Sequence, residues 1–474
     1  MSGMDTPPPQ DPKDLRIAQL EAALAASQAA LAKALERIAE LERRLGMDST
    51  NSSKPPSSDS LKTRAQRRTK KSSGKSQGAQ KGHDGHHRQL LDASKVHHFL
   101  DHLPPRCRGC GNPLSLDEVC AQPVREQTFD LPPITPIVTE HRRLRCRCKA
   151  CGLVTLAPSP LAPGQTRFGP NLLGLLAYLS VAMHATRRAT RELVTQYLGI
   201  PASLGSIQNA LDSVLPAIAP LAHQARAACQ RAGSVGCDET GWSHQGKRAW
   251  IWCVQSEQAA FFKLQDKRDA AACRAMVEPL GQRVVVSDRF GAYNWIEASQ
   301  HQVCHAHLKR DFAGMAKLKG KRGELGAALE KLCGQICVGH SEVMGGERTL
   351  KDYQEWVKNE VRPAWRELIK QSEGWGRQVP AVVSWCAKHE ERVFRFAEGE
   401  EAIAPHNNGT ERAVRSAVIK RKISFGTQSE AGKQVLEALW SVSQTCKKQG
   451  VQLSKTLSDA IAAFHAGLPV PHLV

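Results

Sequence analysis

The sequence predicts a multidomain α/β protein whose central β-sheet is followed by a long helical insertion. Its 474 residues are more than one compact core usually contains, so we expect several domains. Apolar runs rich in β-branched and aromatic residues indicate strands at 249–255, at 259–265 and at the start of 283–293. Helical patterns come before these runs, at 188–215, and after them, between 323 and 396.

The N-terminal region has the heptad spacing of a coiled coil. Residues 15–45 contain no Gly or Pro, and apolar residues recur in two rows, Ile17, Leu24, Leu31, Ile38 and Leu45, with Leu20, Ala34 and Leu41. This spacing predicts a coiled-coil helix over 1–48 and a homodimer or higher oligomer. The alternative is one amphipathic helix packed on its own domain. The polar stretch "NSSKPPSSDS" that follows favours the coiled coil, because it separates the helix from the rest of the chain.

The charge balance indicates a polyanionic partner. The chain carries 65 Lys and Arg against 46 Asp and Glu, a formal net charge of +19, which is typical of nucleic-acid-binding proteins. The basic run 62–75 lies in a polar segment that we expect to be a flexible linker, 49–95. That run suits a phosphate backbone, although a solvated linker without DNA contacts fits it nearly as well.

The same survey argues against a membrane protein. The N-terminus has no apolar signal core, and the most apolar stretch, 172–183, is too short to cross a bilayer. We therefore expect a buried helix at 172–183, no membrane partner, and a cytoplasmic, nucleoid-associated location.

Two short cysteine motifs predict a structural zinc site. "CRGCG" spans 107–111 and "CKACG" spans 148–152, and each pairs two thiols across a tight turn. Two such knuckles supply the four sulfur ligands of a structural zinc ion, here Cys107, Cys110, Cys148 and Cys151. Cys146 is an alternative to Cys148. Disulfides are a less favoured explanation, because 15 cysteines without a secretory signal indicate reduced thiols.

The region that follows, 165–231, reads as helical. Within it, 188–215 has the pattern of a helix, a turn containing glycine and a second helix. DNA-binding helix-turn-helix domains have this pattern, and so do helical hairpins that bind no DNA.

Acidic residues follow two predicted strands. The apolar run in 233–242 is expected to deliver Asp238 at the edge of a strand, and 283–293 places Asp288 after its own strand. Glu239 adjoins Asp238 and should face the opposite side of the sheet. Carboxylates gathered in this way are suited to hard cations such as Mg²⁺.

A third acid, Glu411, lies in "NNGTERAVR" (407–415), where a helix should begin near Asn408. It could complete a set that holds two Mg²⁺ ions about 4 Å apart for phosphodiester chemistry. Alternatively, it pairs with Arg415 four residues later or belongs to an ordinary helix cap. The local sequence alone favours these structural explanations.

Several long motifs occur together in one order. They are "GAQKGHDGHHR" (78–88), the two cysteine knuckles, "FDLPPI" (129–134), "VTEH" (138–141), "DETGW", "SDRFGAY", "CHAHLKRDF", "NNGTERAVR" and "RKISFGTQSEAG" (421–432). Over most of its length the chain resembles a bacterial insertion-sequence transposase of family sixty-six. The resemblance implies an RNase H-like mixed-sheet core with an N-terminal zinc-binding domain. It also implies that Asp238, Asp288 and Glu411 are the catalytic acids and the ligands of Mg²⁺ or Mn²⁺.

The implied activity is DNA transposition: the enzyme cuts and joins the ends of an insertion sequence by two-metal chemistry. The expected partners are double-stranded DNA at the element ends and the target, and a second copy of the chain. The sequence leaves open whether accessory proteins take part. The alternatives are an RNase H-like nuclease without strand transfer, and a degenerate or regulatory zinc-containing dimeric DNA-binding protein. The family more often has aromatic residues at the positions of His305 and Lys420. His305 and His307 with Cys304 could form a second metal site, but their close spacing is more typical of a strand end.

These observations divide the chain into consecutive parts. In order, they are a coiled-coil helix (1–48), a basic linker (49–95), a zinc-binding domain (96–158), a helical DNA-binding region (165–231), the first part of the core (232–318), the helical insertion (319–400), the last part of the core with Glu411 and C-terminal helices (401–464), and a weakly ordered tail (465–474).

Overall fold

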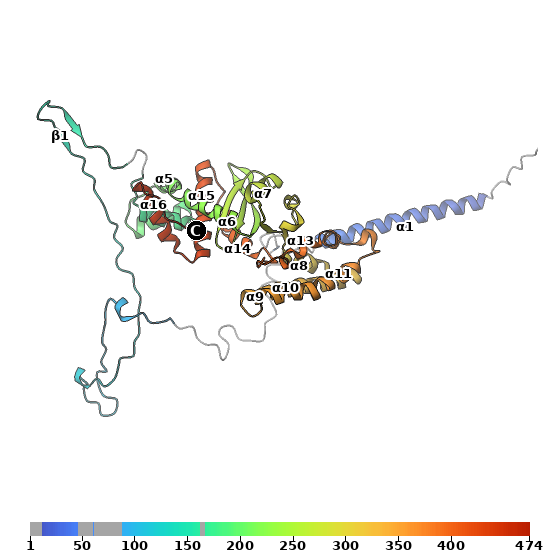
Figure 1. Ribbon diagram of the computed structural model, residues 1–474, viewed down its shortest axis with the longest axis horizontal. Helices are drawn as coiled ribbons and strands as arrows, with labels where there is room; N and C mark the ends of the chain where they lie inside the picture. The colour runs from blue at the N-terminus through green and yellow to red at the C-terminus, as the bar shows by residue number, and fades with distance from the viewer. Residues whose placement is uncertain (1–11, 46–59, 61–87, 162–165) are drawn as a thin grey trace, which may run out of the picture.

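The computed structural model describes residues 12–45, 60, 88–161 and 166–474. The basic run 62–75, the last residues of the predicted coiled coil and the first part of "GAQKGHDGHHR" lie outside these ranges. Helix α1 (Pro12–Leu45) forms over the predicted heptads and projects from the body of the molecule (Figure 1). Its large heptad residues, from Ile17 to Leu45, are 43–87% exposed. No part of the chain that the structure describes buries this row.

A five-stranded mixed sheet forms the centre of the molecule, in the strand order β5-β4-β3-β6-β7. Strands β3, β4 and β5 are an antiparallel meander, and β6 and β7 run parallel to β3. The strand bounds are Ser234–His244 (β3), Lys247–Gln255 (β4), Ala260–Gln265 (β5), Val284–Ser287 (β6) and His301–Val303 (β7). This sheet and its surrounding helices confirm the predicted multidomain α/β class.

Helices cover both faces of the sheet. On one face, α14 (Asn408–Ile423) and α15 (Glu430–Gln449) pack on apolar side chains that include Ile251 and Phe262. There the ring of Trp440 meets the ring of Trp242 edge-on at 5.4 Å. On the other face, α7 (Ala270–Val277) packs over a second apolar cluster. The sheet is therefore buried on both sides, and its functional side chains must emerge where the helices leave a gap.

The helices before the sheet form one layer with the C-terminal helix. They are α3 (Pro170–Val181), α4 (Arg187–Glu192) with a π-helical turn (Leu193–Tyr197), α5 (Leu204–Ser213) and α6 (Leu215–Arg231), packed with α16 (Leu453–His465). Helix α3 buries Leu173, Leu176 and Val181, as predicted for a buried helix at 172–183. Between α4 and α5 the chain turns through Gly199 at a φ of +67°. The predicted order of helix, glycine-containing turn and helix over 188–215 is therefore present.

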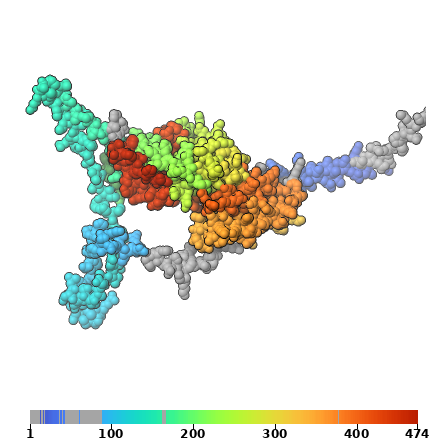
Figure 2. Space-filling view, in the orientation of Figure 1, coloured from blue at the N-terminus to red at the C-terminus, as the bar shows by residue number. Residues whose placement is uncertain are grey.

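The helical insertion shares one apolar cluster with the edge of the sheet, through Val284 and Val286 of β6 and Val303 of β7. Its helices are α8 (His305–Met315), α9 (Lys321–Met344), α10 (Leu350–Trp356) with a π-helical turn (Val357–Val361), α11 (Arg362–Lys370), α12 (Ala381–Lys388) and α13 (Glu390–Phe394). Aromatic rings fill the centre, among them Phe312, Trp365, Phe394 and Phe396. In Figure 2 this part appears as an orange body against the sheet.

The cysteine-rich segment, 88–161, has little regular structure. Its only paired strands in the described range are β1 (Arg145–Arg147) and β2 (Val154–Leu156), and no residue of the segment is buried. A segment without buried apolar residues has no hydrophobic core to hold it together.

The C-terminal residues differ from the predicted weakly ordered tail. Val470 and Leu473 pack against the core, and the Leu473 backbone N–H donates to Gln224 Oε1 at 2.7 Å. Gln224 lies on α6, far away from these residues in the sequence. Among the described helices, none has the length and apolar character needed to cross a membrane.

Candidate active site

Asp238 and Asp288 lie level with each other on neighbouring strands. Strands β3 and β6 are paired in parallel as far as Gly236 and Val286, and each aspartate comes two residues later. Asp288 directly follows β6, and its charge lies close enough to raise the pKa of Asp238. The sequence predicts Asp238 at the edge of a strand. In the structure it lies within β3, which continues to His244 in a hairpin with β4. It is instead the pairing of β3 with β6 that ends at Gly236.

Each aspartate is oriented by a nearby backbone amide. Asp238 Oδ1 accepts from the Glu239 N–H, and Asp288 Oδ1 accepts from the Phe290 N–H, both at 2.9 Å. The second oxygen of each carboxylate accepts no hydrogen bond from a described residue. Both side chains are partly exposed, so one oxygen of each can bind a ligand.

Helix α14 brings Glu411 to the same place. Its first turn docks on β3 through Asn407, whose Nδ2 donates to the Cys237 carbonyl at 2.8 Å. A Cβ atom on Gly236 would lie 2.0 Å from Thr410 Oγ1 and 2.4 Å from Asn407 Oδ1. Only glycine therefore allows this approach of helix to strand. The helix begins at Asn408, as predicted, with Glu411 in its first turn.

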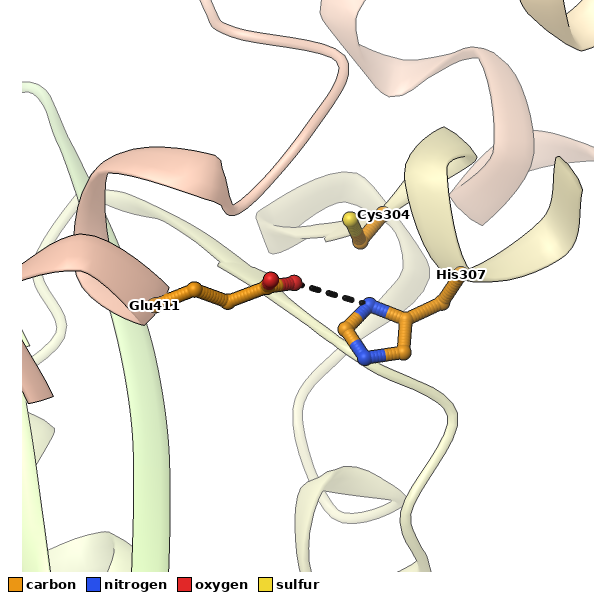
Figure 3. Close-up of side chains that lie close together, drawn as sticks. All are labelled: Cys304, His307 and Glu411. Carbon is orange, nitrogen blue, oxygen red and sulfur yellow. Dashed lines mark ion pairs between the residues drawn. The ribbon is translucent and has the colours of Figure 1, made fainter. Parts of the chain in front are cut away.

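The Glu411 carboxylate contacts side chains of α8 rather than Arg415. Its Oε1 atom lies 3.3 Å from Arg310 Nη2. The same atom lies 3.5 Å from His307 Nδ1 (Figure 3). With Cys304, His307 and Glu411 form the one described set of His, Cys or acidic residues whose ligand atoms all lie within 4.8 Å. The pairing with Arg415 that the sequence left open does not form.

The three predicted catalytic acids do not meet that 4.8 Å criterion. Two ions about 4 Å apart, each about 2.1 Å from its oxygen ligands, separate the outermost ligands by roughly 8 Å. Acids that flank two ions therefore need not touch one another.

Electrostatics also connect these acids. The pKa of Asp238 is raised well above its ordinary value, first by burial and then by repulsion from Glu239, Asp288 and Glu411. Burial raises the pKa of Asp288 and of Glu411 as well, partly offset by the Phe290 amide and Arg268 at Asp288 and by Arg310 at Glu411. Carboxylates that repel one another in a desolvated site are what a divalent cation stabilises.

Glu239 has a different environment. It faces the opposite side of β3, as predicted, and is 8% exposed. Its Oε1 accepts from Arg268 and its Oε2 accepts from the Tyr293 hydroxyl, both at 2.6 Å. These bonds occupy both carboxylate oxygens, so Glu239 stabilises the fold rather than presenting a free ligand.

His305 and Lys420, which stand where the family more often has aromatic residues, are both buried and hydrogen-bonded. His305 lies among Trp365, Phe394 and Phe396, with Nε2 2.8 Å from the Val393 carbonyl, and burial lowers its pKa to about 4. A neutral imidazole thus takes the place of an aromatic ring. Because it points into the insertion core, His305 is not part of a metal site with His307.

Lys420 is the second unusual residue. Its Nζ donates to the carbonyl groups of Ser180 and Ala185 at 3.3 and 3.2 Å, and burial lowers its pKa to about 8. The lysine ties α14 to the end of α3. Its position therefore serves packing and is separate from the acids.

The two cysteine knuckles have the same backbone turn. In each, the glycine N–H donates to the first cysteine carbonyl at 2.9 Å, from Gly111 to Cys107 and from Gly152 to Cys148. Both glycines have positive φ, +79° and +72°, which L-residues rarely adopt. Backbone N–H groups of the turn, that of the second cysteine first, lower the pKa of Cys107 and of Cys148.

The structure closes each knuckle but does not bring the two together. They lie at separate ends of the 88–161 segment (Figure 1), and its four predicted ligands do not form a compact set. Cys146 lies outside the turn, on β1 opposite Thr155. Cys148 and Cys151 therefore have the geometry of the second knuckle.

Sequence reasoning missed the contribution of α8 to the site. Arg310 and His307 lie in the motif "CHAHLKRDF", for which the sequence predicts no contact with Glu411. The spacing of His307 and Arg310, one helical turn apart, places both on one face of a helix, and that was the available signal.

Comparison with known protein families identifies the chain. The profile described as "Transposase IS66 family" matches residues 165–435, more than half of the chain. Residues 104–152 match the zinc-finger binding domain of transposase IS66, and residues 6–89 match a family of unknown function. No curated protein sequence matches the chain. The sheet, the acids and these matches define the protein as an insertion-sequence transposase with a zinc finger. It belongs to the IS66 family of transposases.

Proposed function

We propose that this transposase cuts and joins DNA at the ends of its insertion sequence, with Asp238, Asp288 and Glu411 as the catalytic acids. The observation that carries the proposal is the convergence of these acids from β3, β6 and α14. Two Mg²⁺ or Mn²⁺ ions bound there would activate the attacking hydroxyl and stabilise the departing oxygen of the phosphodiester.

The chain's own residues support this chemistry. The Glu239 and Phe290 amides fix the aspartates, and Arg310 Nη2 donates to Glu411 Oε1. Burial lowers the pKa of His307 to about 3, so a neutral imidazole lies 3.5 Å from the Glu411 carboxylate. A three-stranded antiparallel meander continued by two parallel strands is the arrangement of an RNase H-like core, which we infer for this sheet. The insertion, α8 to α13, then separates Asp288 from Glu411 in the sequence.

We further infer that Cys107, Cys110, Cys148 and Cys151 hold one structural Zn²⁺. The match to a zinc-finger domain and the identical backbone turns support this set over one with Cys146. A shell of four thiolates is held together by the ion itself, so such a domain needs little apolar burial. The zinc domain and the helical region before the sheet would bind double-stranded DNA, and α1 would pair two copies.

A single-turnover assay tests the activity. The protein is mixed with Mg²⁺ and labelled DNA containing the ends of the element, and 3′-end cleavage and joining to a target are measured separately. Both products are expected. Cleavage without joining would indicate an RNase H-like nuclease, and zinc-dependent binding without cleavage would indicate a DNA-binding regulator.

A further inference from the structure

Helix α14 presents a row of basic residues on its exposed face. Arg412, Arg415 and Lys422 are exposed, follow one another at helical spacing, and form no ion pair with a described residue. The opposite face of the helix buries Ala413, Val414 and Ala417 in the core. The helix is therefore fixed on the sheet with its unpaired cations facing outward, beginning beside Glu411.

This basic row ends at a highly exposed aromatic ring. Phe425 follows α14 and is 93% exposed, more than any other described phenylalanine. Water contact with so much apolar surface is unfavourable, and a flexible loop would turn the ring inward. The neighbouring exposed apolar residues, Ile419 and Ile423, are only 39% and 47% exposed.

The loop that carries Phe425 is held in place by the β3–β4 hairpin. The Thr427 N–H donates to the Ser243 carbonyl at 3.0 Å, and the Gln245 N–H donates to the Thr427 carbonyl at 2.8 Å. Gly426 has a φ of +87°, and a Cβ atom there would lie 2.0 Å from the Ser243 carbonyl oxygen. Only glycine fits, so the backbone on the C-terminal side of Phe425 is fixed against the hairpin.

A ring held outward beside a row of cations fits a nucleic acid better than a protein surface. The cations match the phosphates of one DNA strand, and an aromatic ring can stack on a base or enter between base pairs. An apolar protein partner would need a continuous apolar patch, whereas here the two partly exposed isoleucines share the helix with the exposed cations Arg412, Arg415 and Lys422.

The length of α14 sets where such a ring would act. Glu411 and Phe425 are 14 residues apart, which at a rise of about 1.5 Å per residue is roughly 20 Å. DNA rises about 3.4 Å per base step, so this separation corresponds to roughly six steps.

We propose that Phe425 is a wedge that unstacks a base pair of the element end, within roughly six base steps of the scissile phosphate. The basic face of α14 lies along the phosphate backbone and Phe425 enters the stack at its end. The inference rests on the proposed function, because it assumes that Glu411 marks the site of cleavage. Phe425 is a positioning residue that acts on the shape of the DNA.

Fluorescence of 2-aminopurine tests the wedge without requiring cleavage. The base analogue is placed in turn at each position of the element end, and full-length protein is added with Ca²⁺ in place of Mg²⁺. Wild type should raise the fluorescence at a position within roughly six steps of the cleavage site. Phe425→Ala should abolish the increase, Phe425→Trp should retain it, and the exposed-ring control Phe464→Ala should not change it.

Cleavage kinetics supply a second readout. Phe425→Ala should slow cleavage of fully paired DNA by about tenfold, in line with the loss of one base–aromatic contact. A mismatch at the unstacked position should restore the rate. Equal fluorescence with wild type and Phe425→Ala, or no rescue by the mismatch, would overturn the wedge. If wild type cuts no DNA although the fluorescence signal depends on Phe425, the proposed function fails while the wedge stands.

Discussion

The Nδ1 atom of His307 lies 3.5 Å from the Oε1 atom of Glu411 and has no hydrogen-bond partner of its own among the described residues. The two residues come from α8, the first helix of the insertion, and from α14, which follows the insertion in the sequence. Cys304, just before α8, accepts the Asn407 N–H at 3.1 Å. The start of α8 therefore positions both the backbone that leads into α14 and the carboxylate of Glu411.

This contact predicts that His307 tunes metal affinity. His307→Ala should raise the Mg²⁺ concentration for half-maximal cleavage by about tenfold, the size of effect typical of residues that orient metal ligands. The maximal rate should change less. His307→Asn keeps a nitrogen near the Nδ1 position and should restore most of the affinity. A Mg²⁺ titration of cleavage measures both, and an unchanged half-saturation point for His307→Ala would rule out the role.

The acids themselves give the most direct prediction. Asp238→Asn, Asp288→Asn and Glu411→Gln should each lower cleavage and joining by at least about a thousandfold, because partners that act as a unit fail together. DNA binding should survive or tighten slightly, since the substitutions remove negative charge near phosphates. Gel-shift and cleavage assays separate the two properties. The exposed Glu401→Gln is the matched control, and its inactivity would mean that the third acid is misassigned.

Glu239 predicts the reverse pattern. Glu239→Gln weakens the bonds to Arg268 and the Tyr293 hydroxyl and should lower the free energy of unfolding by about 1–3 kcal/mol. Mg²⁺-dependent cleavage by the folded fraction should persist. Urea denaturation with parallel activity measurements tests this, and a stable but inactive variant would place Glu239 among the catalytic acids.

The cysteine knuckles predict one equivalent of zinc per chain. Cys107→Ser and Cys148→Ser should lose it, and residues 105–155 should become sensitive to proteolysis while the core keeps its thermal transition. Cys146→Ser is the control and should keep the metal, because Cys146 lies on β1 outside the turn. The zinc content of the purified proteins is the measurement. If Cys146→Ser loses the metal and Cys148→Ser keeps it, Cys146 rather than Cys148 is the ligand.

Buried Lys420 predicts a pH-dependent stability. Its pKa of about 8 in the folded protein lies below the ordinary 10.5, so between these values the unfolded chain binds more protons and stability rises with pH. Relative to Lys420→Met, wild type should gain up to about 3 kcal/mol as the pH rises from 7 to 10.5. Urea titrations at several pH values measure the difference. Lys422→Met, at an exposed position, is the control and should differ from wild type by the same amount at every pH. If the unfolding free energies of wild type and Lys420→Met change with pH in parallel, the lowered pKa of Lys420 is not the cause.

The exposed heptads of α1 predict an interface. A variant without residues 1–48 should self-associate more weakly and pair two element ends less well, because its exposed Leu and Ile row is the one that a second copy would bury. Light scattering and a two-end pairing assay measure the change. If the oligomer keeps its mass, the copies associate through another surface.

Local patterns were sufficient for most of the fold. Runs of β-branched residues located β4, β5 and β6, and helical periodicity located α9, α14 and the C-terminal helices. The end of β3 was misplaced because its second half is stabilised by pairing with β4, from Gly236–Gln255 to His244–Lys247, and "ETGWSH" is a poor strand by itself. The sequence pattern of one segment does not show whether a neighbouring strand will pair with it.

For the candidate site, the sequence indicates the candidate acids but not their neighbours. The acids themselves were recognisable from motifs, but their surroundings were not. The contacts of Glu411 with Arg310 and His307 join residues 101 and 104 positions apart, and the level placement of Asp238 and Asp288 depends on strand register. The satisfied bonds of Glu239, which distinguish it from Asp238, also depend on tertiary neighbours.

The two ends of the insertion meet beside the site. The His305 N–H donates to the Pro405 carbonyl at 2.8 Å, and the Asn407 N–H donates to Cys304 Sγ. The chain between these points leaves the core and returns to the place from which it departed. A longer, shorter or different insertion can therefore be accommodated without moving the three acids relative to one another in space. Its length and surface can then adapt to the DNA of a particular element while the candidate site keeps its geometry.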